Sequence, residues 1–125
     1  MTPALAAAIV IAGAAGALLR FAVARAFARR PGRGLPWAVL LVNVVGSAIG
    51  GVVLGFAVRG DLAADIQLIL LTGLCGGLTT FSTLSVETVQ FFVEGKARVA
   101  VLSMATNLTL GIGAAAVAFA AVTAL

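Results

Sequence analysis

The sequence predicts an all-α membrane protein with four transmembrane helices, the third of them broken near mid-membrane. Of its 125 residues, 62% are apolar or aromatic and only 10% are charged. A membrane-spanning helix needs roughly 20 mostly apolar residues, and a soluble domain usually carries about 25% charged residues. The composition therefore accommodates four spans. It excludes a soluble enzyme, a disordered chain and, despite the net charge of +4, a nucleic-acid-binding protein.

Charged residues and helix breakers divide the chain into four apolar runs. A basic stretch rich in Gly and Pro, Arg29–Gly34, follows the first run, and turns at Arg59–Asp61 and Glu94–Arg98 follow the second and third. No connection is long enough to separate two domains, so we expect one four-helix domain over residues 1–125. The predicted spans are residues 4–27, 35–58, 66–93 and 99–125.

The basic residues are distributed unequally between the two ends of the predicted helices. The first and third connections, with their flanks, hold six basic side chains, whereas the second connection holds only Arg59. Under the positive-inside rule, this bias predicts that the first and third connections lie in the cytoplasm and that both termini lie outside. The six basic residues are Arg25, Arg29, Arg30, Arg33, Lys96 and Arg98.

The second run contains two pairs of glycines at four-residue spacing, Gly46 with Gly50 and Gly51 with Gly55. Small residues at this spacing let membrane helices approach closely. We therefore expect tight packing along this helix. Four short spans hold too few side chains to enclose a sizeable pathway alone, so we also expect a dimer.

The third run contains the stretch with the most chemical information. The glycine pair Gly76-Gly77, followed by Thr79 and Thr80, predicts that one half-helix ends here and that a capped second half begins, with the split at the glycines. Irregular backbone at membrane depth occurs only inside protein or beside a water-filled path. Carbonyls at the end of the first half can hold a cation, and the start of the second half favours an anion. The alternative is an unbroken helix.

Neutral hydrogen-bonding groups gather around this predicted break. Four of the five residues from 79 to 83 carry hydroxyl groups, and amides or hydroxyls occur at Asn43, Ser103 and Asn107 in two other spans. Each could be an ordinary interhelical hydrogen-bonding residue. Together they predict a narrow path lined by neutral donors, which suits a small, strongly hydrated anion. Glu87 is the one plausible intramembrane acid, placed toward one end as a candidate gate or entrance residue.

The segment Gly76–Thr83, followed by Ser85 and Glu87, occurs together with Gly16–Arg20, Pro36-Trp37 and Val42–Ser47. These segments resemble the Fluc (CrcB) family of fluoride-specific ion channels. The resemblance covers three spans well and the fourth by pattern only. It implies a multi-pass protein of the bacterial inner membrane that is not an enzyme. Its function would be to let fluoride leave the cytoplasm passively and so to lower fluoride toxicity.

The resemblance also implies a cofactor and a second subunit. The backbone carbonyls of Gly76 and Thr79 would bind a structural Na⁺ that is not transported, together with the same pair from an antiparallel partner. A homodimer of opposed subunits requires chains inserted in both directions, a dual topology. The strong charge bias favours one orientation instead, and hence a heterodimer with an oppositely oriented paralogue. Both pairings remain open at this point.

A third implication of the resemblance concerns the residues that line the pore and its vestibule. The ring edge of Phe81 would contact fluoride, and Asn43, Ser82 and Thr83 would line the path. Arg20 would face a vestibule, where its charge raises the local anion concentration. The alternative for Arg20 is an interfacial arginine that snorkels to the headgroups.

The sequence departs from the family pattern at two pore-lining positions. Leu84 stands where many members have a second phenylalanine, and Ser103 stands about where the fourth span usually offers a tyrosine. These departures leave a non-conducting partner subunit of a channel heterodimer as one alternative function. A proton-coupled exporter of the small multidrug type, using Glu87, is the other.

Overall fold

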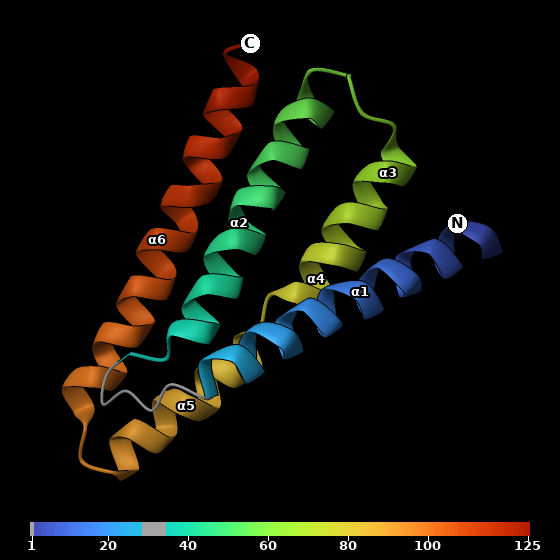
Figure 1. The fold of residues 1–125 in the computed structure, drawn as a ribbon. Coiled ribbons are helices and arrows are strands. Elements are labelled where there is room, and N and C mark those ends of the chain that lie inside the picture. The colour runs from blue at the N-terminus through green and yellow to red at the C-terminus, as the bar shows by residue number, and fades with distance from the viewer. Residues whose placement is uncertain (1, 29–34) are drawn as a thin grey trace.

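The structure, a computed structural model, describes residues 2–28 and 35–125 (Figure 1). Its described part is all-helical, and four helices are long and apolar enough to cross a membrane. Their ends lie close to the predicted ones, whereas the predicted basic stretch Arg29–Gly34 lies outside the described residues. The four helices are α1 (Pro3–Ala28), α2 (Trp37–Val58), the composite third span (Ala64–Val93) and α6 (Ala97–Thr123).

The third span consists of several segments, and its break lies later than the sequence predicted. It begins with α3 (Ala64–Leu68) and continues through a π-helical segment, η1 (Ile69–Cys75), into α4 (Gly76–Leu78). Thr79 and Thr80 are extended, with ψ angles of 158° and 116°, and α5 (Phe81–Val93) follows. The expected split at the glycine pair was therefore wrong by two residues. The glycines stay helical, and the two threonines form the break.

Two glycines of the third span, Gly73 and Gly77, pack against the backbone of α1, whereas Gly76 is exposed. A Cβ atom added to Gly77 would overlap the Gly13 carbonyl oxygen, and one added to Gly16 would overlap the Leu74 carbonyl oxygen. A Cβ atom at Gly73 would lie 2.7 Å from the Ile9 carbonyl oxygen. Such small residues allow two helix backbones to touch, which is how spans associate in lipid. This contact fixes α1 against the segment that precedes the break.

The glycines of α2 provide the predicted close packing, although not all of them contribute equally. α2 and α6 lie side by side over most of their length (Figure 1). Gly51 faces the Ala115 backbone so closely that an added Cβ would overlap its carbonyl oxygen, and a Cβ at Gly55 would lie 2.7 Å from Val122. Gly46 instead accommodates the Thr79 methyl group at the break. Gly50 makes only an ordinary contact.

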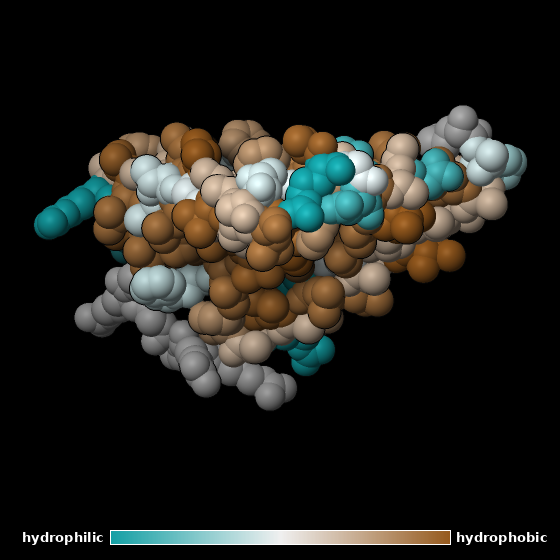
Figure 2. Space-filling view, turned by 90° about the horizontal axis from the view of Figure 1, so that it is seen from above, coloured by the Kyte–Doolittle hydropathy of each residue, from teal (hydrophilic) through white to brown (hydrophobic). Residues whose placement is uncertain are grey.

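Most of the surface is apolar, as a lipid-facing protein requires. In the space-filling view hydrophobic residues predominate and hydrophilic ones are few (Figure 2). Exposed side chains include Val10 and Ile11 of α1 and Leu108 and Val117 of α6, each at least 64% exposed. With four candidate spans and this surface, the chain is a multi-pass membrane protein.

The contact between α1 and the third span can be tested with a matched pair of glycine substitutions. We expect Gly16→Ala to lower the free energy of unfolding by about 2–3 kcal/mol, because the new methyl group overlaps backbone that cannot move aside. Gly113→Ala in α6 meets nothing within 4 Å and should be neutral or slightly stabilising. Thermal unfolding in detergent measures both, and equal stability of the two variants would contradict the packing argument.

Candidate functional site

The break in the third span begins a new helix with a well-formed cap. Thr80 precedes α5, and its Oγ1 accepts a hydrogen bond from the Thr83 N–H at 3.1 Å. The same hydroxyl donates to Thr83 Oγ1 at 2.9 Å and lies 3.3 Å from Ser82 Oγ. A threonine cap of this kind satisfies one of the free N–H groups at a helix start. The electropositive start of α5 therefore lies beside three hydroxyl groups.

Asn43 of α2 holds the break from the opposite side. Its Oδ1 accepts from the Thr80 N–H at 2.8 Å, and its Nδ2 donates to the Thr80 carbonyl oxygen at 3.2 Å. Nδ2 also donates to Asn107 Oδ1 on α6 at 2.9 Å. In a continuous helix the Thr80 N–H would instead bond to the Gly76 carbonyl. The Asn43 side chain therefore stabilises the extended backbone and leaves the Gly76 carbonyl without its usual helical donor.

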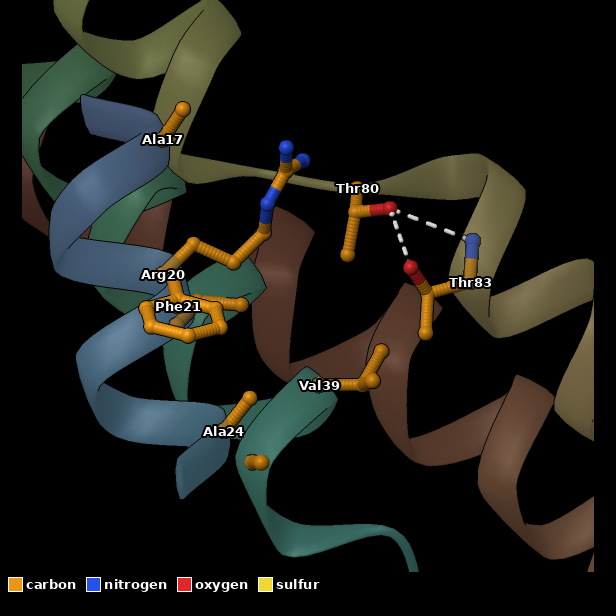
Figure 3. A pocket seen from close by; sticks show the side chains of 9 residues that line it. Ala17, Arg20, Phe21, Ala24, Val39, Thr80 and Thr83 are labelled. Carbon is orange, nitrogen blue, oxygen red and sulfur yellow. Dashed lines mark hydrogen bonds between the residues drawn. The ribbon is translucent and has the colours of Figure 1, made fainter. Parts of the chain in front are cut away.

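Arg20 of α1 contacts the other residue of the break. Its Nη1 donates to the Thr79 carbonyl oxygen at 3.0 Å, while the Thr79 hydroxyl donates to the Cys75 carbonyl at 2.8 Å. Figure 3 shows Arg20 extending from α1 toward the extended segment next to Thr80. A side chain bonded to this backbone is part of the polar centre. The contact therefore favours a role for Arg20 in the site over simple snorkelling.

A cavity of about 260 Å³, here called the vestibule cavity, lies between α1, α2 and the start of α5 (Figure 3). Arg20 provides its positive charge, and Thr80 and Thr83 provide its hydroxyl groups. Because the Thr80 hydroxyl donates to Thr83 Oγ1, the hydrogen of the Thr83 hydroxyl is free to bond a ligand. The lining residues are Ala17, Arg20, Phe21, Ala24, Ala38, Val39, Val42, Thr80 and Thr83.

Phe81 lies beside two further hollows, and its side chain is 80% exposed. One, of about 230 Å³, is lined by Thr79 and Thr80 and therefore lies beside the break. The other, here called the Phe81 groove, has a volume of about 510 Å³ and runs between α5 and α6. Leu84 and Asn43 line both hollows. The Phe81 groove is lined by Asn43, Phe81, Leu84, Val101, Met104, Ala105, Asn107 and Leu108.

Two of the predicted site residues lie in less open positions. Ser103 of α6 is only 1% exposed, and its carbonyl accepts from Asn107 Nδ2 at 3.0 Å. Glu87 of α5 is half-buried. Within the described part of the chain, Ser103 Oγ and Glu87 Oε2 are buried and make no hydrogen bond. Their expected places on a pathway stay predictions.

Several other hydroxyl groups near the site bond to their own helices. Each donates to a carbonyl one turn earlier, at 2.7–2.9 Å, as threonine and serine often do in membrane helices. They therefore do not extend the polar cluster at the break. These residues are Ser85, Thr88, Thr106 and Thr109.

Comparison with known proteins establishes the family. Residues 7–119 match the family described as CrcB-like protein, Camphor Resistance (CrcB). The chain belongs to this family. It is 40% identical over 112 residues to the fluoride-specific ion channel FluC 1 of Thermobifida fusca, with 90% of each chain covered. It is 40% identical over 111 residues to the fluoride-specific ion channel FluC of Renibacterium salmoninarum, covering 84% of this chain and 88% of the relative.

A third relative, the fluoride-specific ion channel FluC 1 of Nitrobacter hamburgensis, is 34% identical over 108 residues, with 86% of each chain covered. The resemblance drawn from the sequence is thus confirmed. Because the relatives are named as ion channels, the family is not one of enzymes, as the sequence indicated.

The sequence predicted a capped helix start after Thr79 and Thr80 but not the full role of Thr80. The structure makes this residue the helix cap, as expected, and also the backbone partner of Asn43. The pairing of Asn43 with the Thr80 backbone could not be predicted, because the two residues lie 37 positions apart in the sequence and meet only in the folded protein.

The Asn43 bridge gives a direct test of what holds the break. We expect Asn43→Leu to lower the free energy of unfolding by roughly 2–4 kcal/mol, because two backbone groups of Thr80 and the Asn107 side chain lose a partner in an apolar environment. Thr109→Val, which removes an exposed hydroxyl bonded to its own helix, is the matched control. Denaturant titration in detergent compares them. A loss no greater than that of the control would refute the bridge.

Proposed function

We propose that the protein is a passive, fluoride-specific ion channel of the bacterial inner membrane that lets fluoride leave the cytoplasm and so lowers its toxicity. Family membership carries this proposal, since relatives covering most of the chain are named fluoride-specific ion channels. The site supports it independently. Three features at the break attract a small anion: the positive charge of Arg20, the free hydrogen of the Thr83 hydroxyl and the start of helix α5.

The route would begin in the vestibule cavity and continue past the break. Arg20 raises the anion concentration there, and its remaining N–H groups and the Thr83 hydroxyl can donate hydrogen bonds. Ser82 and the electropositive ring edge of Phe81 would then replace further water molecules. Fluoride gains most from such donors because it is the smallest halide. Chloride would be rejected by size and by incomplete replacement of its hydration shell.

Passive conduction needs no proton-carrying carboxylate within the membrane, whereas proton-coupled export does. Glu87 is half-buried in α5, and a coupled exporter would have to use it as the proton carrier. A Glu87→Gln variant therefore separates the two functions. It would abolish proton-coupled drug efflux but would leave a fluoride channel able to discriminate between fluoride and chloride.

The end of α4 offers groups that fit a structural Na⁺. The Gly76 carbonyl has lost its helical donor to Asn43, and the Thr79 carbonyl retains a lone pair beside its bond to Arg20. Gly76 is exposed, so the same groups of a second subunit could approach it. We assign Na⁺ to these two carbonyls and their counterparts in a partner. The bound ion would supply fixed positive charge between the subunits and would not be transported.

A second subunit is needed because one chain leaves the pathway open. Phe81 is 80% exposed, and the Phe81 groove lacks a wall on its outer side. We propose an antiparallel dimer in membrane lipid, in which each subunit completes the other's path. It is either a homodimer or a heterodimer with an oppositely oriented paralogue.

Liposomes containing the purified protein test the channel. We expect fluoride efflux without chloride efflux, and we expect Phe81→Ile to lower the fluoride rate about tenfold or more, because the electropositive ring edge is lost. Phe92→Ile, an exposed phenylalanine on the same helix, is the control and should conduct normally. Unchanged fluoride efflux in Phe81→Ile would contradict the pore assignment. If the chain alone gave no fluoride efflux and a paralogue added to the liposomes restored it, the chain would be one subunit of a heterodimer.

The pairing can be decided by the direction of insertion. Arg59, the one basic side chain of the second connection, donates to the Val122 carbonyl at 2.9 Å and pairs with Asp61 at 2.8 Å, which leaves that end with little free positive charge. We therefore expect a reporter on the C-terminus to lie outside in nearly all molecules. Equal populations inside and outside would instead establish the dual-topology homodimer.

A further inference from the structure

The contact between Arg20 and Thr79 places a fixed positive charge at the break. The Arg20 Nη1 is 3.0 Å from the Thr79 carbonyl oxygen, and the side chain is half-buried. This oxygen ends the first half-helix, where carbonyls lack helical donors and attract cations. Arg20 therefore acts as a cation supplied by the protein itself, bonded to an oxygen that a free cation could also use.

The packing of α1 holds Arg20 in reach of this oxygen. Gly16 lies one turn before Arg20, and an added Cβ there would overlap the Leu74 carbonyl. Gly77 makes a comparable contact, because a Cβ added there would overlap the Gly13 carbonyl oxygen. Because these helix backbones touch, α1 cannot tilt away without opening a gap in the core. Arg20 must therefore rotate its own side chain to release the carbonyl.

We propose that Arg20 and a monovalent cation compete for the Thr79 carbonyl, so that Arg20 weakens Na⁺ binding at the break and takes the place of the ion when it is absent. The inference rests on the proposed Na⁺ site at Gly76 and Thr79. The carbonyl has two lone pairs, and both partners can bond to it at once in principle. Two like charges on one oxygen repel strongly in a poorly hydrated centre. Binding of Na⁺ therefore requires that the guanidinium shift or that the repulsion be overcome.

The expected strength of the competition follows from Coulomb's law. Two unit charges a few ångströms apart, at the effective dielectric constant typical of proteins, change an equilibrium by roughly ten- to a hundredfold after partial screening. Neutralising Arg20 should therefore tighten Na⁺ binding by at least about tenfold. A residue with a merely structural role at this position would weaken the site when replaced, because the break would lose a stabilising contact.

The test is the Na⁺ dependence of thermal unfolding, measured on the purified full-length protein as it assembles in detergent. NaCl replaces N-methylglucamine chloride at constant ionic strength, so that only the cation changes. A ligand that binds the folded state raises its stability by mass action. The rise of the unfolding midpoint temperature with Na⁺ concentration therefore gives the Na⁺ concentration for half-saturation. The variants are Arg20→Met and Arg20→Gln. The matched control is Arg25→Gln, an exposed arginine on the same helix.

We expect half-saturation at a Na⁺ concentration at least about tenfold lower in both Arg20 variants and unchanged in Arg25→Gln. Arg20→Gln keeps an amide donor for the Thr79 carbonyl, so it provides the measurement if Arg20→Met does not fold. Equal or weaker Na⁺ binding in the Arg20 variants overturns the competition while leaving the Na⁺ site intact. A midpoint independent of Na⁺ in every form overturns both the competition and the Na⁺ site, whereas fluoride efflux tests the channel separately.

Discussion

The cost of leaving backbone groups unpaired in hydrocarbon governs this fold. Thr80 is extended inside a span, so its N–H group cannot bond to the Gly76 carbonyl as it would in a continuous helix. The Asn43 side chain accepts from this N–H and also donates to the Thr80 carbonyl oxygen. Without that amide, the apolar surroundings would favour a continuous helix, because only there would the Thr80 N–H find a partner. The capped start of α5 and the free carbonyl at the end of α4 both follow from this pairing.

Close packing at glycines brings the functional side chains of neighbouring helices to the break. The contacts of α1 with η1 and α4 are made between backbones, which brings Arg20 close enough to bond to Thr79. On the other side, Gly46 of α2 leaves room for the Thr79 methyl group. Larger residues at these positions would separate the three helices. The charge, the hydroxyl groups and the amide would then no longer surround the same two residues.

The sequence predicted the four spans, the broken third helix and the close packing of α2, because composition and glycine spacing act locally. It also identified Asn43 and Asn107 as polar residues of two spans that need hydrogen-bond partners. It misplaced the break by two residues, since a glycine pair can end a helix or let one pack closely, and only the neighbouring α1 decides between these. The bond from Arg20 to Thr79 joins residues 59 positions apart and has no local signature.

The Asn43 amide has one more consequence. It bonds to the Thr80 backbone much as the peptide group of a neighbouring β-strand would, so that a single residue of a helical protein is held by strand-like pairing. Such pairing fixes register. A residue inserted at the exposed turn of Gly60 or Gly95 would merely lengthen a connection. One inserted between Gly77 and Thr80 would turn a different backbone group toward Asn43, so this short segment has a fixed length even where its side chains can vary.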